Sequence, residues 1–498
     1  MSGTVLLFCG AALYLLLNLF ASPRVPFLIG GDQVYFWMDA LRILDGRRVY
    51  QDFLQFTPAG TDLLFALLFK VFGQRMWVTN LVVLVLGLAF VWLTYSIARQ
   101  LMRPAWSTLA AVLFLVPIYG TALNATHHWF GALGVLAAIR VLLGGITSSR
   151  VAVAGGILGV ASFFSLTHGV AALLAFSVFL AIDSARAPTG RRGFLPGQAV
   201  LWSAYVLELA MLSSPYLASI GARRLCYFQV TYVWRFVVHA YRGEAPALFP
   251  PPLRLTFHNL PALSEYLVVY LLLGAATAGA LHLCWIGRRE KSPIQPILLV
   301  VLVAVFLFAE VGLSLSWLRV YAVSAPGVIL AAWVVERLPT LRAAASTALW
   351  AWVFLLAAHQ TITHHHMQRA IVALPVGKVA TTTTTADGLT LVAKFVKPGD
   401  SLFHAGWPGL YLPLQVRNPL YFDTAGEVDM PRPSDVGFAI GQLEERRVSY
   451  VLWAERLDWS RPSSQCSERL TPLLEYLRAA YEPVATLPNG DTLWRRRA

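Results

Sequence analysis

Charged residues are scarce in this chain of 498 residues. Asp, Glu, Lys and Arg together make up 13% of it, whereas soluble globular domains contain about 25%. Hydrophobic residues make up 57% and the mean hydropathy is +0.61, so intrinsic disorder, which needs low hydrophobicity and high charge, is excluded as well. The composition therefore excludes an ordinary soluble enzyme and indicates a chain that lies largely in a membrane.

Cysteine and the common catalytic motifs are also sparse. The four cysteines are far apart in the sequence, which excludes a disulfide framework and a cysteine-based zinc site; they are Cys9, Cys226, Cys284 and Cys466. Residues 363–498 contain no G-x-S-x-G elbow, no P-loop and no G-x-G-x-x-G fingerprint. The reactions that depend on those motifs are therefore not expected there, and no nucleic-acid partner is expected.

Long apolar runs are abundant. A bilayer-spanning helix needs about 20 mostly apolar residues, because unpaired backbone polar groups are costly in hydrocarbon. By this criterion we count about eleven runs, near residues 4–22, 77–98, 105–123, 129–146, 151–167, 169–183, 199–217, 266–286, 294–316, 320–336 and 343–362. A shorter apolar run at 58–73 contains Asp62 and Lys70 and is interpreted as interfacial or re-entrant.

Residues 363–498 have a different character, with 15 Lys and Arg against 14 Asp and Glu. Short β-like runs such as SLFHAG and VSYVLWA alternate with helical runs such as DVGFAIGQLEERR, a pattern typical of a small α/β domain. We therefore predict an all-α polytopic membrane domain with about eleven transmembrane helices over residues 1–362, followed by a soluble α/β domain over residues 363–498.

Positive charge is concentrated in the apolar part, where residues 1–362 carry 24 Lys and Arg against 12 Asp and Glu. If the N-terminus is cytoplasmic, the short cytoplasmic connections contain the arginines that the positive-inside rule requires, among them Arg103, Arg150, Arg192, Arg289 and Arg342. An odd number of spans then places residues 363–498 outside the membrane. Two outer loops, 23–76 and 218–265, also contain arginines, which the rule does not explain and which a binding function would.

The most informative segment is residues 30–60, GGDQVYFWMDALRILDGRRVYQDFLQFTPAG. Its apolar residues recur at helical spacing on one face; they are Val34, Trp37, Met38, Leu41 and Leu44. The pattern predicts an amphipathic helix that lies in the membrane interface, with Asp39 and Arg42 as an i,i+3 ion pair on another face. Asp32 directly precedes this helix, where an aspartate is the usual N-cap, so capping and catalysis are both open for it.

This segment resembles the first periplasmic loop of GT-C-type membrane glycosyltransferases, and in particular those of the bacterial protein O-mannosyltransferase and aminoarabinose transferase group. The residues that carry the resemblance are Asp32, Tyr35, Ala40, Gly46, Tyr50, Asp52, Phe53, Pro58, Gly60, Phe72 and Gly73. The resemblance implies an inverting enzyme in the bacterial cytoplasmic (inner) membrane. Such an enzyme takes a sugar from a polyprenyl-phosphate donor and transfers it to an envelope glycan, lipid or protein acceptor on the outer face. It also implies that Asp32 is the catalytic residue.

The chemistry of such a transfer agrees with an acid and arginines at the membrane surface. A carboxylate that takes the proton of the acceptor hydroxyl contributes about 10²–10⁴-fold, and arginines stabilise the departing phosphate. The candidates for donor-phosphate binding are Arg235, Arg242, Arg319 and Tyr321. Weaker candidates for substrate binding are Tyr35, Asp52, His127, His128 and His258.

Several of these residues have a structural alternative. Asp52 can pair with Arg48, the basic outer loops can anchor to anionic lipids, and Arg319 can reach water from the end of a span. Glu310 lies within a predicted span, where an ionisable group is either functional or paired with a neighbouring helix. His364, His365 and His366 are interpreted as a solvated linker, with metal binding as the alternative.

Two departures from the family pattern leave the metal requirement open. Gln33 stands where many relatives have a glutamate, and the next outer loop, Asn124 to Trp129, contains His127 and His128 but no carboxylate. A divalent cation is therefore weakly supported. Two other functions are also open: a flippase or transporter for lipid-linked sugars, and a non-catalytic protein of envelope polysaccharide assembly. A transporter predicts inverted repeats, and we find no internal repeat.

Overall fold

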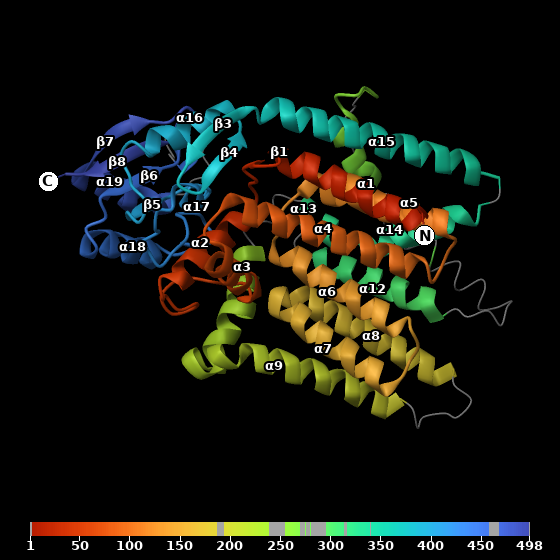
Figure 1. Ribbon diagram of the computed structural model, residues 1–498. Coiled ribbons are helices and arrows are strands. Elements are labelled where there is room, and N and C mark those ends of the chain that lie inside the picture. Colours follow the sequence, from red (N-terminus) through yellow and green to blue (C-terminus); the bar gives the residue numbers. More distant parts are fainter. Residues whose placement is uncertain are drawn as a thin grey trace. The chain divides into compact units, whose positions relative to one another are not determined.

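The computed structural model describes most of the chain, namely residues 2–186, 194–238, 254–268, 274, 279, 295–312, 316–338, 340–457 and 468–497. Contacts divide the chain into two compact units, each built from three segments (Figure 1). Unit 1 comprises Met1–Asn18, Val83–Ser219 and Tyr241–His364, and unit 2 comprises Leu19–Val82, Ile220–Ala240 and His365–Ala498. The predicted domain boundary at residue 363 stays a prediction.

Unit 1 is helical, as the apolar runs predict. Its helices include α1 (Ser2–Leu19), α4 (Met76–Ala98, which begins in unit 2), α5 (Pro104–Phe114), α6 (His127–Leu142), α7 (Ser148–Phe164), α8 (Leu166–Arg186), α9 (Phe194–Cys226), α12 (Gln295–Val311), α13 (Trp317–Ala322), α14 (Ala325–Glu336) and α15 (Arg342–Met367). Helices α6, α7, α8 and α12 pack side by side, and α14 packs against both α12 and α5 (Figure 1).

Small residues bring two of these helices close together. Gly155 and Gly159 lie one turn apart on α7, and a Cβ atom added to them would lie 2.4 Å from the Leu201 carbonyl and 2.8 Å from the Tyr205 carbonyl of α9. This is the small-xxx-small arrangement by which membrane helices approach each other closely. Leu6, Trp92 and Leu207 are exposed on unit 1, as is expected of side chains that face lipid.

The described helices support a membrane protein without confirming eleven spans. Four are long and apolar enough to cross a bilayer: Met76–Ala98, Pro104–Ala122, Leu166–Ala185 and Pro196–Val237. Shorter apolar helices are Gly3–Leu19, His127–Leu142, Ser148–Phe164, Gln295–Val311 and Ala325–Glu336. The predicted span at 266–286 lies almost wholly outside the described residues.

Two predicted loops are helical. Residues 218–237, which we assigned to an outer loop, continue α9 through a break at Gly221 (φ +76°) into π-helical turns over Tyr227–Val237. The apolar residues between the charges, such as Phe228 and Val237, are buried, which keeps this segment folded. Helix α15 extends to Met367, so the three histidines at 364–366 lie on its last turns and not in a linker.

Unit 2 contains the predicted α/β region. Its elements are β1 (Phe20–Ser22), β2 (Val25–Pro26), α2 (Gln33–Leu44), α3 (Gly60–Phe72), β3 (Ala370–Leu374), β4 (Gly377–Thr381), α16 (Thr383–Val392), β5 (Leu402–His404), α17 (Tyr411–Leu414), α18 (Pro433–Glu445), β6 (Tyr450–Trp453), α19 (Thr471–Ala480), β7 (Tyr481–Thr486) and β8 (Thr492–Arg496). Strands β3 and β4 form a hairpin, and the larger sheet has the order β5-β6-β8-β7, with β5 and β6 parallel and the other pairs antiparallel.

Helix α2 differs from the prediction of a helix lying on the membrane surface. Its residues from Gln33 to Arg42 are buried on nearly every face, with the exception of Tyr35. The predicted apolar face is in the core, where Trp37 packs against Phe65 of α3 at 6.4 Å between ring centroids. The polar face is covered too, because residues 420–423 bind Arg42. Protein surrounds this helix, and it is a core element of unit 2.

Candidate active site

Asp32 lies at the N-terminal end of α2, in the position that a capping residue occupies. Its backbone is helical (φ −58°, ψ −16°), and its side chain makes no capping hydrogen bond to the first turn of α2. An N-cap residue usually has an extended backbone that directs its side chain to the free amides. The capping interpretation of Asp32 is therefore not realised here. The residue is partly exposed, whereas its neighbour Gln33 is completely buried.

The turn before Asp32 is fixed by the backbone conformation of Gly31 and by a side-chain hydrogen bond from Gln33. Gly31 has φ +83°, a conformation that residues with a Cβ atom rarely adopt. The Gln33 side-chain amide donates a hydrogen bond to the Gly30 carbonyl at 3.0 Å. Gln33 thus has a structural role, because a carboxylate could not donate this hydrogen bond. It stands at the position where many members of the family that the loop resembles have a glutamate.

A buried ion-pair network anchors the C-terminal half of α2. Arg42 Nη1 lies 2.8 Å from Asp39 Oδ1, as the i,i+3 spacing predicts, and also binds Asp423. Arg42 Nη2 donates to the carbonyls of Leu420 and Phe422, each at 3.1 Å. Arg42 is only 2% exposed, so its charge is neutralised by protein carboxylates and not by water.

A third buried carboxyl group, that of Asp62, joins this network through the side-chain amide of Gln55. Gln55 Nε2 donates to Asp39 Oδ2 at 3.1 Å and to Asp62 Oδ2 at 2.8 Å, so it links α2 to α3. Gln55 Oε1 accepts the backbone N–H groups of Phe56 and Thr57, both at 2.9 Å. The loop between α2 and α3 is thereby fixed at its centre.

Burial shifts the protonation of these carboxyls. Burial, and then the charge of Asp423, raise the pKa of Asp39 well above its ordinary value, although Arg42 opposes the shift. Burial raises the pKa of Asp62 well above its ordinary value, and it raises that of Asp423. Arg42 thus faces three buried carboxyl groups, and burial raises the pKa of each of them.

Two weaker candidates of the first loop are involved in structural contacts. Tyr35 packs edge-on against Trp407, with ring centroids 5.2 Å apart. Asp52 pairs with Arg48 at 3.4 Å and accepts the Arg48 backbone N–H at 2.7 Å, as the structural alternative for Asp52 predicts. Tyr50, one of the residues that carry the resemblance, donates to the Thr57 carbonyl at 2.8 Å and accepts a hydrogen bond from Gln229 at 2.9 Å.

A polar cluster lies within unit 1. The rings of His127 and His128 are 3.9 Å apart, and the rings of His128 and His168 are 5.2 Å apart. His168 Nδ1 lies 3.1 Å from Glu310 Oε2, so Glu310 is paired with a neighbouring helix. Arg319 is within electrostatic range of His127, His128 and Glu310. Helices α6, α8, α12 and α13 thus bring these side chains together.

The remaining donor-phosphate candidates are not part of this polar cluster. Tyr321 is buried, and its hydroxyl finds no hydrogen-bond partner among the described residues. It lies two residues from Arg319 on α13, a spacing that does not place both side chains on one face. Arg235 is exposed, with its guanidinium 5.5 Å from the centroid of the Phe236 ring. His258 is exposed near His359, and Arg242 lies outside the described residues.

No group of three or more His, Cys, Asp or Glu side chains is arranged to hold a metal ion in the part of the chain that the structure describes. Sequence reasoning missed His168 as a partner of Glu310. It also missed Asp423, which follows Arg42 by 381 positions. An ionisable residue inside an apolar run was the available signal for His168; no signal indicated Asp423.

Comparison with known proteins gives a clear result for the fold. No protein-family model matches the chain, and no curated protein is similar to it. Among solved structures, ArnT from Cupriavidus metallidurans bound to undecaprenyl phosphate matches 100% of this chain and 99% of its own, with a TM-score of 0.63 and 14% sequence identity.

The oligosaccharyltransferase of Archaeoglobus fulgidus matches as well. Its complex with zinc and sulfate covers 98% of this chain and 73% of that chain, with a TM-score of 0.57 and 14% identity. Its complex with an inhibitory peptide and a dolichol-phosphate covers 99% and 74%, with a TM-score of 0.52 and 12% identity. These proteins are GT-C glycosyltransferases. The chain thus has their fold, and the resemblance predicted from its first loop is confirmed for the fold.

Proposed function

We propose that this protein is an inverting membrane glycosyltransferase. It takes a sugar from a polyprenyl-phosphate donor and transfers it to an acceptor outside the bacterial cytoplasmic membrane. The observation that carries the proposal is the fold, which is similar over the whole length of both chains to that of ArnT bound to undecaprenyl phosphate. The N-terminus is cytoplasmic in this proposal, and the C-terminal α/β region is periplasmic.

Asp32 acts as the general base. Its carboxylate takes the proton of an acceptor hydroxyl while the hydroxyl oxygen forms a bond to the anomeric carbon of the sugar. The bond between that carbon and the phosphate oxygen breaks, and the polyprenyl phosphate leaves with the electron pair. Two observations support this role: the place of Asp32 in the loop that carries the sequence resemblance, and the partial exposure of its side chain.

The phosphate of the carrier is bound by Arg319 or by Tyr321, which project from different faces of α13. Arginine suits this task because its guanidinium stays charged and forms paired hydrogen bonds to phosphate oxygens. The buried Tyr321 hydroxyl has no partner among the described residues, which is unusual for a buried donor and is explained if a ligand oxygen accepts its hydrogen bond. Arg235 and Arg242 are the second choice for the same phosphate.

The weaker assignments follow from the same reaction. His127 and His128 are proposed to contact the substrate because Arg319 lies within electrostatic range of both. Tyr35, Asp52 and His258 remain candidates for contact with the donor or the acceptor. The structural contacts of Tyr35 and Asp52 supply the alternative explanation for these two.

The test uses purified full-length protein in nanodiscs with polyprenyl phosphates that carry different labelled sugars, together with an envelope extract as acceptor. The proposal predicts that one donor is consumed, with one polyprenyl phosphate released for each sugar transferred. A fluorescent lipid-linked sugar in vesicles is followed in parallel. Movement of the intact lipid between leaflets without cleavage would favour a flippase. The absence of both activities with every donor would favour a non-catalytic assembly protein.

A further inference from the structure

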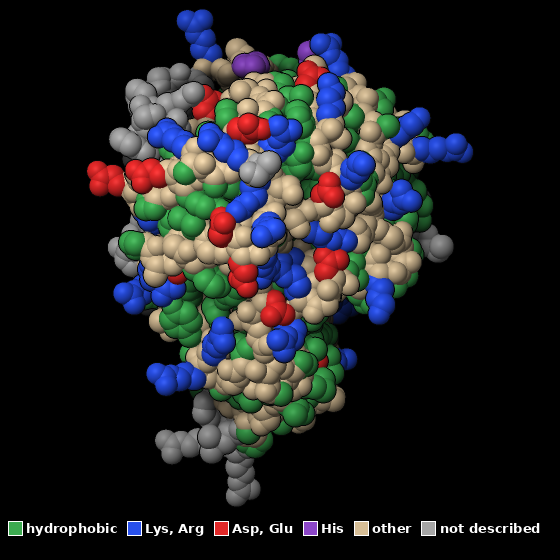
Figure 2. Space-filling view, turned by 90° about the vertical axis from the view of Figure 1, so that its left-hand side faces the viewer, with side chains coloured by type: hydrophobic (Ala, Val, Ile, Leu, Met, Phe, Trp, Pro, Cys, Tyr) green, Lys and Arg blue, Asp and Glu red, His purple; other side chains and the backbone are tan. Residues whose placement is uncertain are grey.

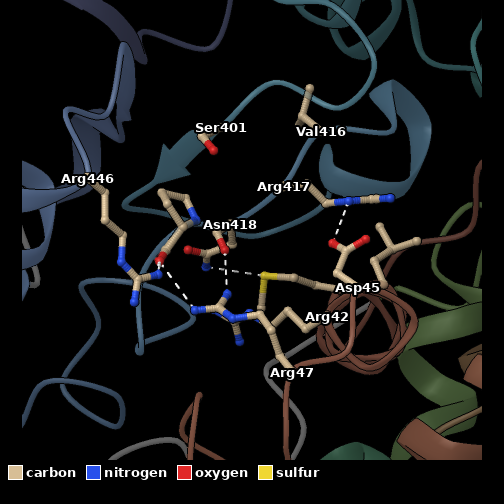
Figure 3. Close-up of a pocket in the computed structure, with 11 residues that line it drawn as sticks. Arg42, Asp45, Arg47, Ser401, Val416, Arg417, Asn418 and Arg446 are labelled. Atoms are coloured by element: carbon tan, nitrogen blue, oxygen red, sulfur yellow. Dashed lines mark hydrogen bonds and ion pairs between the residues drawn. The ribbon is translucent and has the colours of Figure 1, made fainter.

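A small cavity lies within unit 2 beside the C-terminal end of α2. Its volume is about 240 Å³, below the range of about 300–1,000 Å³ that is common for drug-sized ligands. The polar side chains that line it include Asp45, Arg47, Ser401, Arg417, Asn418 and Arg446 (Figure 3). The cavity thus has the size for one sugar residue with a charged substituent, and not for an oligosaccharide.

The arginines of this cavity differ in how their charge is balanced. Arg417 Nε lies 2.6 Å from Asp45 Oδ2, and Arg42, which also lines the cavity, is neutralised by the buried network described above. Arg47 and Arg446 have no such partner: among the residues that the structure describes, no carboxylate lies within ion-pair distance of either one. These two guanidinium groups therefore lack a direct ion-pair partner, although the charges of Asp52 and Asp39 act on Arg47 from a greater distance.

These two guanidinium groups also meet at one place. Arg47 donates to the Pro419 carbonyl at 3.3 Å, and Arg446 donates to the same carbonyl. Arg47 further donates to the Asn418 carbonyl at 2.8 Å. Backbone carbonyls orient the two cations, but they do not cancel the repulsion between two like charges.

The electrostatics of Arg47 agree with this repulsion. Burial, and then the charges of Arg42 and Arg446, lower the pKa of Arg47 to about 10, while the charges of Asp52 and Asp39 oppose the shift. An anion in the cavity would relieve this repulsion. General surface charge does not account for the feature, because Figure 2 shows Lys and Arg side chains interspersed with Asp and Glu over the face on which α18 and α19 lie. The cavity differs from that surface because two of its arginines, Arg47 and Arg446, have no carboxylate within ion-pair distance among the described residues, and its one lining carboxylate, Asp45, pairs with Arg417.

We propose that this cavity binds an oxyanion, a phosphate or a carboxylate, carried on a single sugar residue. The identification of that sugar as part of the acceptor rests on the proposed function, while binding itself does not. Arginine pairs recognise both oxyanions through charge-assisted hydrogen bonds. Arg446 is exposed at the rim, and Arg47 is half-buried, so an anion can enter past Arg446 and reach Arg47.

The experiment measures binding without turnover. Isothermal titration of the full chain in nanodiscs of neutral lipid, without donor, uses inorganic phosphate, glucose 6-phosphate, glucuronate and glucose as probes. We expect saturable binding of the three anions and none of glucose. Arg446→Gln should weaken the binding of glucose 6-phosphate about tenfold, as expected for the loss of one charge-assisted hydrogen bond. Arg446→Lys should retain most of the affinity.

The matched control is Arg495→Gln. Arg495 is an exposed arginine paired with Glu482 at 2.5 Å on the C-terminal sheet, and its replacement should leave binding unchanged. A thermal melt of each variant shows whether it is folded. Failure of all three anions to bind to folded wild-type protein would overturn the proposal, and so would an Arg446→Gln variant that binds them as tightly as wild type.

Further outcomes distinguish a lipid head group from an acceptor sugar as the source of the anion, and distinguish this inference from the proposed function. If nanodiscs of phosphatidylglycerol abolish glucose 6-phosphate binding, the ligand is a lipid head group, and the assignment to an acceptor sugar is overturned. Anion binding in a protein that transfers no sugar would contradict only the proposed function. Sugar transfer by a protein that binds no anion would contradict only this inference.

Discussion

Replacement of Arg42 by methionine should destabilise unit 2 severely. Methionine is also unbranched and can occupy the buried site, but the change removes the Arg42 partner of Asp39 and Asp423 and leaves the carbonyls of Leu420 and Phe422 without their donor. Removing one member of a buried ion pair costs about 3–5 kcal/mol, because the remaining charge is buried and unpaired. The two lost carbonyl bonds add to this cost, although the contributions are not additive.

This loss in the free energy of unfolding corresponds to a lower melting temperature. For a unit of about 200 residues, 1 kcal/mol shifts Tm by about 2–4 °C, so we expect a loss of roughly 6–20 °C. The loss should be smaller at acidic pH. Burial already raises the pKa of Asp39 and of Asp423, and removal of Arg42 raises both further, so the folded variant takes up protons and is most stable where both carboxyls are protonated.

The assay is a thermal melt combined with hydrogen exchange of the amides in α2 and in residues 418–424. The control is Arg48→Met, which removes an exposed pair with Asp52 and should cost at most about 1 kcal/mol. A second variant, Arg42→Met with Asp39→Asn and Asp423→Asn, should recover much of the stability because no buried charge remains. The reasoning is refuted if Arg42→Met melts no lower than Arg48→Met.

Three further predictions concern single buried groups. Asp62→Asn should flatten the dependence of Tm on pH. Because burial raises the pKa of Asp62, the stability of the wild-type protein decreases as the pH rises above about 3.8, the ordinary value for an aspartate. Equal slopes of Tm against pH in the two proteins would contradict this prediction. Gln33→Glu should lower stability by about 1–3 kcal/mol in denaturant titrations at neutral pH, less at acidic pH where a protonated carboxyl can donate; an unchanged midpoint would count against the Gly30 bond. Tyr321→Phe should leave Tm equal or higher, because it removes an unpartnered buried hydroxyl, while weakening polyprenyl-phosphate binding about tenfold; a lower Tm with unchanged binding would exclude the proposed phosphate contact.

Local patterns predicted the helices and the α/β region well. Runs of apolar residues identify α4, α8 and α12 because such runs depend only on neighbouring positions. The Asp39–Arg42 pair followed from helical spacing alone. The alternation of short strands and helices after residue 363 likewise predicted β5, β6 and α18.

Long-range contacts account for what the sequence analysis missed. The amphipathic pattern of α2 is present, but its apolar face does not meet lipid as the pattern predicts. In the structure α3 covers that face, and residues 420–423 cover the polar one. The Arg47–Arg446 cavity joins residues that are almost 400 positions apart, and no local spacing indicates such a pair. The helical turns after residue 217 are not predicted, because arginines interrupt the apolar run there while the buried residues that keep the segment folded are spaced between them.

The most direct test of the central claim compares sugar transfer by wild type, Asp32→Asn and Asp387→Asn. Asp387 is an exposed aspartate of α16 and serves as the matched control. With a polyprenyl-phosphate donor that wild type consumes, Asp32→Asn should lower kcat by about 10²–10⁴-fold, with little change in the donor KM, whereas Asp387→Asn should match wild type. Transfer by folded Asp32→Asn at the wild-type rate would contradict the assignment of Asp32 as the base.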